Sequence, residues 1–151
     1  MTTQDRPSQV LIVANRTAAT QPLLDAVSER AAAGPAAFHL LVPAAPRGLH
    51  RLVDPEVAGR LEAATQLDLA LERLSAQTGA PVTGHVGDAD PLAAISDAMH
   101  GQHFDEIIIS TLSRRLSRWM HMDLPSKARG LGLPVLHVSP DSPPAEVQRA
   151  A

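Results

Sequence analysis

Hydroxyl and guanidinium groups gather in one short stretch of the sequence, and their types suit the binding of an anion. The stretch begins at the end of an isoleucine-rich run and contains Ser110, Thr111, Ser113, Arg114, Arg115 and Arg118. Guanidinium groups bind phosphate or carboxylate oxygens through paired charge-assisted hydrogen bonds, and hydroxyls add single donors. The stretch is therefore a candidate site for a phosphate-bearing ligand.

Two simpler interpretations of the same residues stay open. Serine and threonine hydroxyls often serve only to cap helices and close turns. The arginines, together with Lys127 and Arg129, make residues 114–129 a basic segment. Such a segment is either a solvated surface or a docking site for an acidic protein partner.

The elements around this stretch alternate between short apolar runs and amphipathic stretches. Apolar runs typical of buried strands occupy residues 10–14, 38–42, 82–86, 106–111 and 134–138. Helices are expected over residues 21–33, 57–78, 91–101, 114–122 and 124–131. The third helix has the clearest start, with Asp90 as its N-cap and Pro91 as its first residue.

Alternation of this kind predicts an α/β fold with a five-stranded parallel sheet and helices on both faces, similar to Rossmann folds. The chain has 151 residues, which suits one domain. We expect this domain over residues 9–139, with flexible segments at 1–8 and 140–151.

In open parallel sheets, ligands bind beyond the carboxyl ends of the strands, where the strand order reverses. With the order 3-2-1-4-5, that point lies between the first and fourth strands. Asn15, Arg16 and Thr17 follow the first strand and face the hydroxyls and arginines that follow the fourth. The order itself is an assumption at this point, because periodicity does not show it.

Composition excludes several classes of protein. Aromatic residues are 2% of the chain, too few for stacking on nucleic acid, and the formal charge of −3 gives no attraction to it. No apolar run reaches the roughly 18 residues of a membrane span. The chain has no cysteine, which fits a reducing compartment. We expect a cytoplasmic protein that binds neither membrane nor nucleic acid.

Recognisable catalytic machinery does not appear in the sequence. There is no Gly-x-Ser-x-Gly elbow, metalloprotease motif or standard P-loop. Asp88 and Asp90 are explained by a turn and a helix cap. His100 and His103 lie at a predicted helix end without companions that would complete a metal site. We therefore expect neither catalysis nor a bound metal.

Four segments together resemble the universal stress protein family over residues 9–139. They read VLIVANRT, FHLLVP, HVGDADPLAAI and DEIIISTLSRRLSRWMHMDLPSKARGLGLPVLHV. The resemblance implies the strand order 3-2-1-4-5, and it implies a regulatory or stress-response module. Many members of that family form dimers and bind ATP or AMP. A dimer through the fifth strand would place His137 at its edge.

The sequence departs from the family pattern at the nucleotide-binding motif. Members that bind ATP carry Gly-x-x-Gly, nine residues, then Gly-Ser or Gly-Thr after the fourth strand, whereas residues 110–125 contain no glycine. Asn15 stands at a position that is usually acidic and near the nucleoside. Val42 matches the position whose backbone faces adenine. The arginines of residues 114–118 would then replace the phosphate contacts of backbone amides.

Three functions follow, in order of preference. The first is a module that binds an adenine nucleotide or another phosphate ligand between the ends of the first and fourth strands. The second is a nucleotide-free module whose basic segment, Arg114 to Arg129, docks an acidic protein. The third is a nucleotide hydrolase, for which the sequence offers no catalytic residues.

Overall fold

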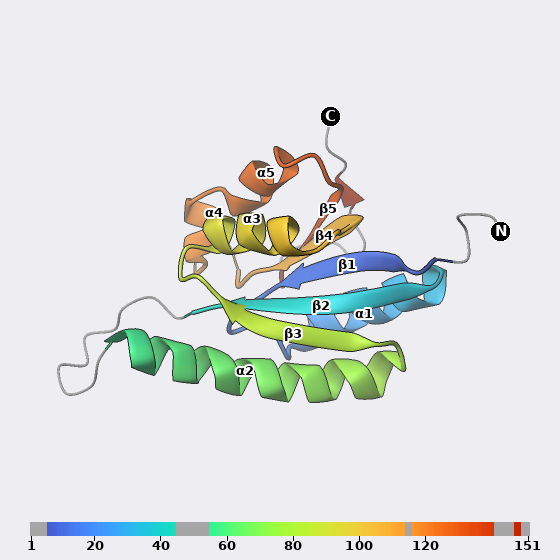
Figure 1. Cartoon of the computed structure of the whole chain (residues 1–151), viewed down its shortest axis with the longest axis horizontal. Helices are drawn as coiled ribbons and strands as arrows, with labels where there is room; N and C mark the ends of the chain where they lie inside the picture. Colours follow the sequence, from blue (N-terminus) through green and yellow to red (C-terminus); the bar gives the residue numbers. More distant parts are fainter. Residues whose placement is uncertain (1–5, 45–54, 114–115, 141–146, 149–151) are drawn as a thin grey trace.

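The computed structural model describes residues 6–44, 55–113, 116–140 and 147–148 of the chain, shown in Figure 1. The strands are β1 (Ser8–Val13), β2 (Ala36–Pro43), β3 (Val82–Gly87), β4 (Glu106–Ser110), β5 (Val135–Val138) and β6 (Val147–Gln148). The helices are α1 (Gln21–Ala33), α2 (Pro55–Thr78), α3 (Pro91–Gly101), α4 (Arg118–His121) and α5 (Leu124–Arg129). None of these helices is both long and apolar enough to cross a bilayer.

The strands form one sheet in the order β3-β2-β1-β4-β5-β6. The first five pair in parallel, which confirms the predicted five-stranded sheet and its order 3-2-1-4-5. A sixth strand was not predicted: β6 pairs antiparallel with β5, with Leu136 opposite Val147. It lies within residues 140–151, which the sequence had suggested to be a flexible segment, and most of that segment lies outside the described residues.

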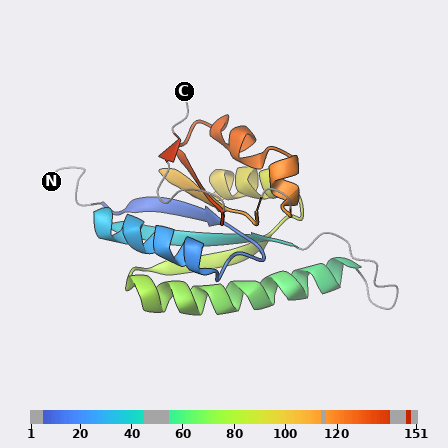
Figure 2. The same cartoon turned by 180° about the vertical axis from the view of Figure 1, so that it is seen from behind.

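Helices cover both faces of the sheet. α1 and α2 lie on one face, and α3, α4 and α5 lie on the other (Figures 1 and 2). The isoleucines of β4 show why a parallel strand must be apolar throughout: Ile108 packs into the core under α1 and α2, whereas Ile107 and Ile109 pack into the core under α3 and α5. Each core therefore takes alternate residues of the same strand.

The start of α3 agrees with the sequence. The side chain of Asp90 accepts a hydrogen bond of 3.2 Å from the backbone N–H of Leu92, and Pro91 is the first helical residue. The cap satisfies a donor that the helix itself leaves unpaired. It also fixes where the loop after β3 ends, directly at the carboxyl edge of the sheet.

The helix predicted over residues 114–122 is wrong at its start. α4 begins only at Arg118, and Ser117 is its N-cap, whose hydroxyl accepts from the N–H of Met120 at 3.2 Å. The backbone N–H groups of Leu116 and Ser117 both donate to the carbonyl of Ser113, which makes a turn before the helix. Helical periodicity in the sequence did not reveal that turn.

Asp123 separates α4 from α5. Its backbone has φ 56° and ψ 41°, in the left-handed region that aspartate tolerates better than most residues. This turn ends α4 after one turn of helix, and Pro125 lies in the first turn of α5. The short α4 is thereby held at the carboxyl edge, where its residues Arg118 and Trp119 reach the predicted ligand position.

Candidate functional site

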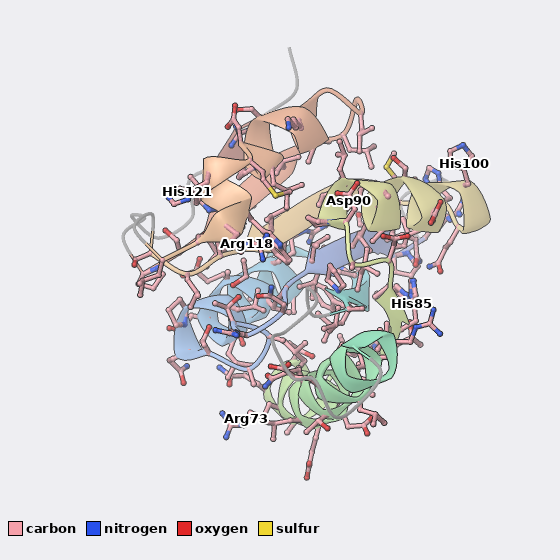
Figure 3. The ribbon with its side chains drawn as sticks, turned by 90° about the vertical axis from the view of Figure 1, so that its left-hand side faces the viewer. Arg73, His85, Asp90, His100, Arg118 and His121 are labelled. Atoms are coloured by element: carbon pink, nitrogen blue, oxygen red, sulfur yellow. The ribbon has the colours of Figure 1, made fainter. Side chains whose placement is uncertain are left out.

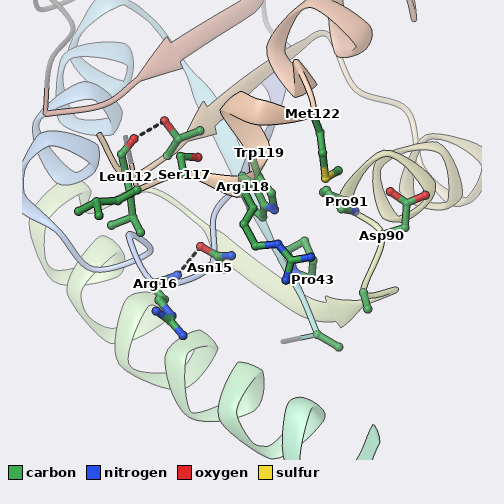
Figure 4. Close-up of a pocket in the computed structure, with 14 residues that line it drawn as sticks. Asn15, Arg16, Pro43, Asp90, Pro91, Leu112, Ser117, Arg118, Trp119 and Met122 are labelled. Carbon is green, nitrogen blue, oxygen red and sulfur yellow. Dashed lines mark hydrogen bonds between the residues drawn. The ribbon is translucent and has the colours of Figure 1, made fainter. Parts of the chain in front are cut away.

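A cavity of about 440 Å³ opens at the carboxyl edge of the sheet. Its walls come from the segments that follow four consecutive strands of the sheet, β3, β2, β1 and β4 (Figure 4). The lining residues are Asn15, Arg16, Pro43, Ala44, Ala89, Asp90, Pro91, Thr111, Leu112, Leu116, Ser117, Arg118, Trp119 and Met122. Its position is the switch point that the sheet order predicts, and its size is typical of small-molecule sites.

Asn15 presents a hydrogen-bond donor to this cavity. Its Oδ1 accepts from the backbone N–H of Arg16 at 2.6 Å, and a backbone N–H can only donate. The amide oxygen is therefore fixed toward the turn, which leaves the Nδ2 amino group on the cavity side (Figure 4). A carboxylate at this position would keep the bond to Arg16 but would offer an acceptor to the cavity instead.

Two guanidinium groups stand at the cavity. Arg16 and Arg118 are both exposed and both line it, and Arg118 extends from the first residue of α4 toward Pro43 (Figure 4). Asp90 lines the opposite side, at the start of α3, as Figure 3 shows in a view onto this edge. The cavity thus has a cationic side and one carboxylate across from it, an arrangement suited to an anionic ligand that also carries a donor.

Apolar side chains line much of the remaining wall. Trp119 is 7% exposed and packs into the core under α3 and α5, and it forms part of the cavity wall. Leu116 is 71% exposed, and Met122 is 38% exposed. A cavity with one large aromatic surface and two flexible apolar side chains suits a flat heterocycle.

The structure brings four of the predicted site residues together at this cavity: Asn15, Arg16, Thr111 and Arg118. The Oγ1 of Thr111 donates to the carbonyl of Leu112 at 2.9 Å and also lies 2.9 Å from the Nε2 of His137. The hydroxyl of Thr111 is therefore occupied by the protein, and Thr111 belongs to the wall of the cavity.

The structure places four other predicted residues away from the cavity lining. Thr17 and Ser110 are buried and hydrogen-bonded to each other, with their hydroxyl oxygens 2.8 Å apart. Val42 is fully buried under α1 and α2, while its neighbours Pro43 and Ala44 line the cavity. Ser113 closes the turn before α4 through its carbonyl. The two remaining predicted residues, Arg114 and Arg115, lie outside the described residues.

Sequence reasoning missed several lining residues. Asp90 and Pro91 were interpreted only as a helix cap, although every loop that follows a parallel strand ends at the same edge of the sheet. Trp119 and Met122 were also missed, whereas their neighbour His121 is exposed and does not line the cavity. A helix that begins at Arg118 with Ser117 as its N-cap, and not at residue 114, would have indicated which side chains of this segment face the cavity.

Metal ligands do not gather anywhere in the described part of the chain in groups of three or more histidine, aspartate or glutamate residues. His103 pairs with Asp105, with Nε2 and Oδ1 2.8 Å apart, and the Nδ1 of His100 lies 2.7 Å from the carbonyl of Ser96. These two histidines thus have protein partners at the end of α3.

Comparison with known proteins supports the fold. No protein-family model matches the sequence, and neither does any curated protein. Among solved structures, a universal stress protein family member from Burkholderia pseudomallei aligns with a TM-score of 0.61 at 20% identity, over 91% of this chain and 96% of that one. The universal stress protein from Archaeoglobus fulgidus in complex with dAMP aligns with a TM-score of 0.56 at 18% identity, over 88% and 98%.

A third structure, a universal stress protein in complex with cAMP, aligns with a TM-score of 0.58 at 18% identity, over 87% of this chain and 96% of that one. At these identities the comparisons establish a shared fold. They agree with the family resemblance drawn from the sequence, and they show that proteins with this fold hold adenine nucleotides in at least two cases.

Proposed function

We propose that this protein is a regulatory module similar to universal stress proteins, and that it binds an adenine nucleotide in the cavity at the carboxyl edge of the sheet. The observation that carries the proposal is that Arg118 and Trp119 both line the cavity at the switch point. Arg118 can bind a phosphate group, and Trp119 supplies an aromatic wall for the base. The bound nucleotides of two proteins that share the fold support the choice of ligand.

The nucleoside is proposed to lie beside Asn15, and the phosphate beside Arg118. Three backbone N–H groups near the start of α4 already have partners: those of Leu116 and Ser117 donate to the carbonyl of Ser113, and that of Met120 donates to the hydroxyl of Ser117. These three groups are not available to phosphate, and the guanidinium group of Arg118 is proposed as the main phosphate donor.

Calorimetric titration with AMP and with ATP tests the proposal. Wild-type protein is expected to bind at least one of them saturably, and Arg118→Ala is expected to weaken the affinity about tenfold or more, the loss of a charge-assisted hydrogen bond of roughly 1.5–3 kcal/mol. Lys127→Ala is the matched control, because it removes one exposed positive charge that does not line the cavity. Absence of saturable binding of either nucleotide at millimolar concentration would refute the proposal.

We propose binding without turnover. Within the described cavity lining, Asp90 is the one carboxylate, and it already caps α3; histidine and lysine do not line the cavity. Incubation with ATP followed by a product assay is expected to give no hydrolysis above the rate without protein. Hydrolysis that Arg118→Ala abolishes would show an enzyme.

A cytoplasmic homodimer is part of the same proposal and rests on the resemblance and on the cysteine-free composition. A dimer through the edge of β5 has to accommodate β6, which pairs with Val135 and Leu136 on that side. Light scattering of the purified chain measures the oligomeric state. A dimer that persists after deletion of residues 141–151 would be compatible with contact through β5, and a monomer of the full chain would exclude it.

An acidic protein partner is the alternative function for the basic segment. Arg118 and Lys127 are exposed, so both are accessible to such a partner. Charge reversal at both positions is expected to abolish association with an acidic partner and to leave the isolated fold intact. Nucleotide binding that competes with the partner would place both at the same surface.

A further inference from the structure

Two histidine rings lie against each other on the face of the sheet that α3 only partly covers. His39 is on β2 and His85 on β3, and the Nε2 of His39 is 2.6 Å from the Nδ1 of His85. Because Leu41 and Gly87, two residues further along each strand, pack under α3, both histidines point to that same side of the sheet. His85 is exposed at the outer side of β3 (Figure 3).

A separate cavity adjoins the pair. Its volume is about 280 Å³, and His39, His85, Asp97 and Phe104 are among its lining residues. It shares no lining residue with the larger cavity at the carboxyl edge. The pair thus faces a cavity, and the exposed residue Asp97 of α3 lies on another of its walls.

Thr83 orients the first ring. Its Oγ1 lies 2.8 Å from the Nδ1 of His39, on the side of the ring away from His85. When the N–H at Nδ1 donates to this hydroxyl, the lone pair of His39 is at Nε2 and points toward His85. In metal-binding histidines, the ring nitrogen that does not bind the metal usually donates a hydrogen bond to a polar neighbour, which fixes the tautomer and the orientation of the ring.

We propose that His39 and His85 form a binding site for a single borderline divalent transition ion, Zn²⁺, Ni²⁺ or Cu²⁺, through Nε2 of His39 and Nδ1 of His85. Neutral imidazole nitrogens are preferred ligands for these ions. His85 is exposed, so its proton can reside on its other nitrogen, in contact with solvent, when Nδ1 holds the ion.

Binding of an ion would replace a hydrogen bond. The two nitrogens are 2.6 Å apart and the ring centroids 4.9 Å apart, so the nitrogens face each other directly and share a hydrogen bond. Two nitrogens at about 2.0–2.1 Å from one Zn²⁺ lie roughly 2.8–3.4 Å apart for coordination angles near 90–110°. The rings must therefore separate, and they must also turn until both lone pairs point at the ion. The pair offers two protein ligands, in keeping with the lack of three-residue metal groups in the described part of the chain. The ion therefore keeps water in its other positions and exchanges readily.

Burial helps the pair to accept an ion. Desolvation, and then the neighbouring His85, lower the pKa of His39 below its ordinary value of 6.5. A lowered pKa favours the neutral imidazole of His39, the form in which its nitrogen can bind a metal. The outward position of His85 leaves a path from solvent to the pair.

Titration with ZnCl₂ or NiCl₂, followed by calorimetry and by the midpoint of thermal unfolding, tests the site. We expect saturable binding of one ion per chain and a midpoint that rises with ion concentration. His85→Gln keeps an exposed polar side chain and is expected to reduce the affinity at least tenfold. His121→Ala is the matched control, since it removes an exposed histidine elsewhere, and it is expected to bind as the wild type does.

A second measurement keeps the test independent of folding defects. Cu²⁺ added to ¹⁵N-labelled wild-type protein is expected to broaden the amide signals of β2 and β3 near His39 and His85, and to leave those near His121 sharp. Lack of any saturable binding at millimolar ion, or binding that His85→Gln leaves unchanged, would overturn the proposal.

Discussion

The hydroxyl of Ser110 donates to the hydroxyl oxygen of Thr17 at 2.8 Å, which joins the end of β4 to the loop after β1 across 93 positions of sequence. The Oγ1 of Thr17 in turn donates to the carbonyl of Ser110 at 3.1 Å. Both residues are buried, so these bonds are shielded from water. The two hydroxyls that the sequence suggested as ligands of an anion instead hold the loop after β1 against the end of β4, at the point where the sheet order reverses.

This relationship predicts that Thr17→Val destabilises the fold. The substitution keeps the shape of the side chain but leaves the buried hydroxyl of Ser110 without its acceptor, at a cost of about 1–3 kcal/mol. Urea unfolding measures the difference. Thr65→Val is the control, because Thr65 is exposed on α2 and bonds only to the carbonyl one helical turn before it. Equal stability of the two variants would contradict a structural role for the hydroxyl pair.

Asn15→Asp exchanges a donor for an acceptor at the cavity. The carboxylate can still accept from the N–H of Arg16, so the turn after β1 is preserved. With the ribose beside this position, its hydroxyls gain an acceptor, and adenosine affinity is expected to rise about fivefold, equivalent to roughly 1 kcal/mol. Calorimetry with adenosine avoids repulsion from phosphate. Weaker adenosine binding by the variant would mean that the nucleoside does not lie beside Asn15.

Gly84→Ala is expected to destabilise the protein by about 1–3 kcal/mol through overpacking. A Cβ at Gly84 would lie 2.8 Å from the backbone oxygen of Leu40 and 2.6 Å from a methyl group of Leu67, so β3 and α2 would have to separate. Gly101→Ala, in the last turn of α3 where no atom lies within 4 Å of such a Cβ, is the control and is expected to be neutral or stabilising. A Gly84→Ala variant as stable as wild type would show that α2 adapts freely.

The pair of histidines predicts a pH dependence of stability. Because the pKa of His39 is lower in the folded protein than its ordinary 6.5, the unfolded chain binds a proton first as the pH falls. The free energy of unfolding is therefore expected to decrease as the pH falls below about 6.5, until His39 is protonated in the folded state as well. His85 and Asp97 are the titratable groups that line the same cavity.

His39→Gln removes this titration. Its unfolding free energy, measured between pH 8 and pH 5, is expected to fall less steeply than that of wild type, while His100→Gln is expected to follow wild type. A steeper decrease in His39→Gln would mean that protonation of His39 stabilises the fold, which is the opposite sign.

The sequence predicted the sheet well because its signals are local and redundant. Isoleucines 107–109 are apolar on both sides of the strand, and Asp90 with Pro91 marks a helix start in two ways. The candidate site was harder. Val42 was predicted to contribute through its backbone, whereas the cavity lining begins one residue later, at Pro43, and the side chain of Val42 is in the core. The positions of Arg118 and Trp119 at the cavity depend on the turn before α4, where the N–H groups of Leu116 and Ser117 donate to the carbonyl of Ser113. Sequence periodicity does not show that turn.

The most direct test of the proposed function uses Trp119, the only tryptophan of the chain, as a reporter within the cavity wall. Titration of the protein with AMP and ATP is followed by tryptophan fluorescence. We expect a saturable change in intensity or emission maximum, with a midpoint that moves to higher concentration in Arg118→Ala and stays in place in Lys127→Ala. Calorimetric binding of nucleotide without any change at Trp119, or with an unchanged midpoint in Arg118→Ala, would contradict the placement of the nucleotide in this cavity.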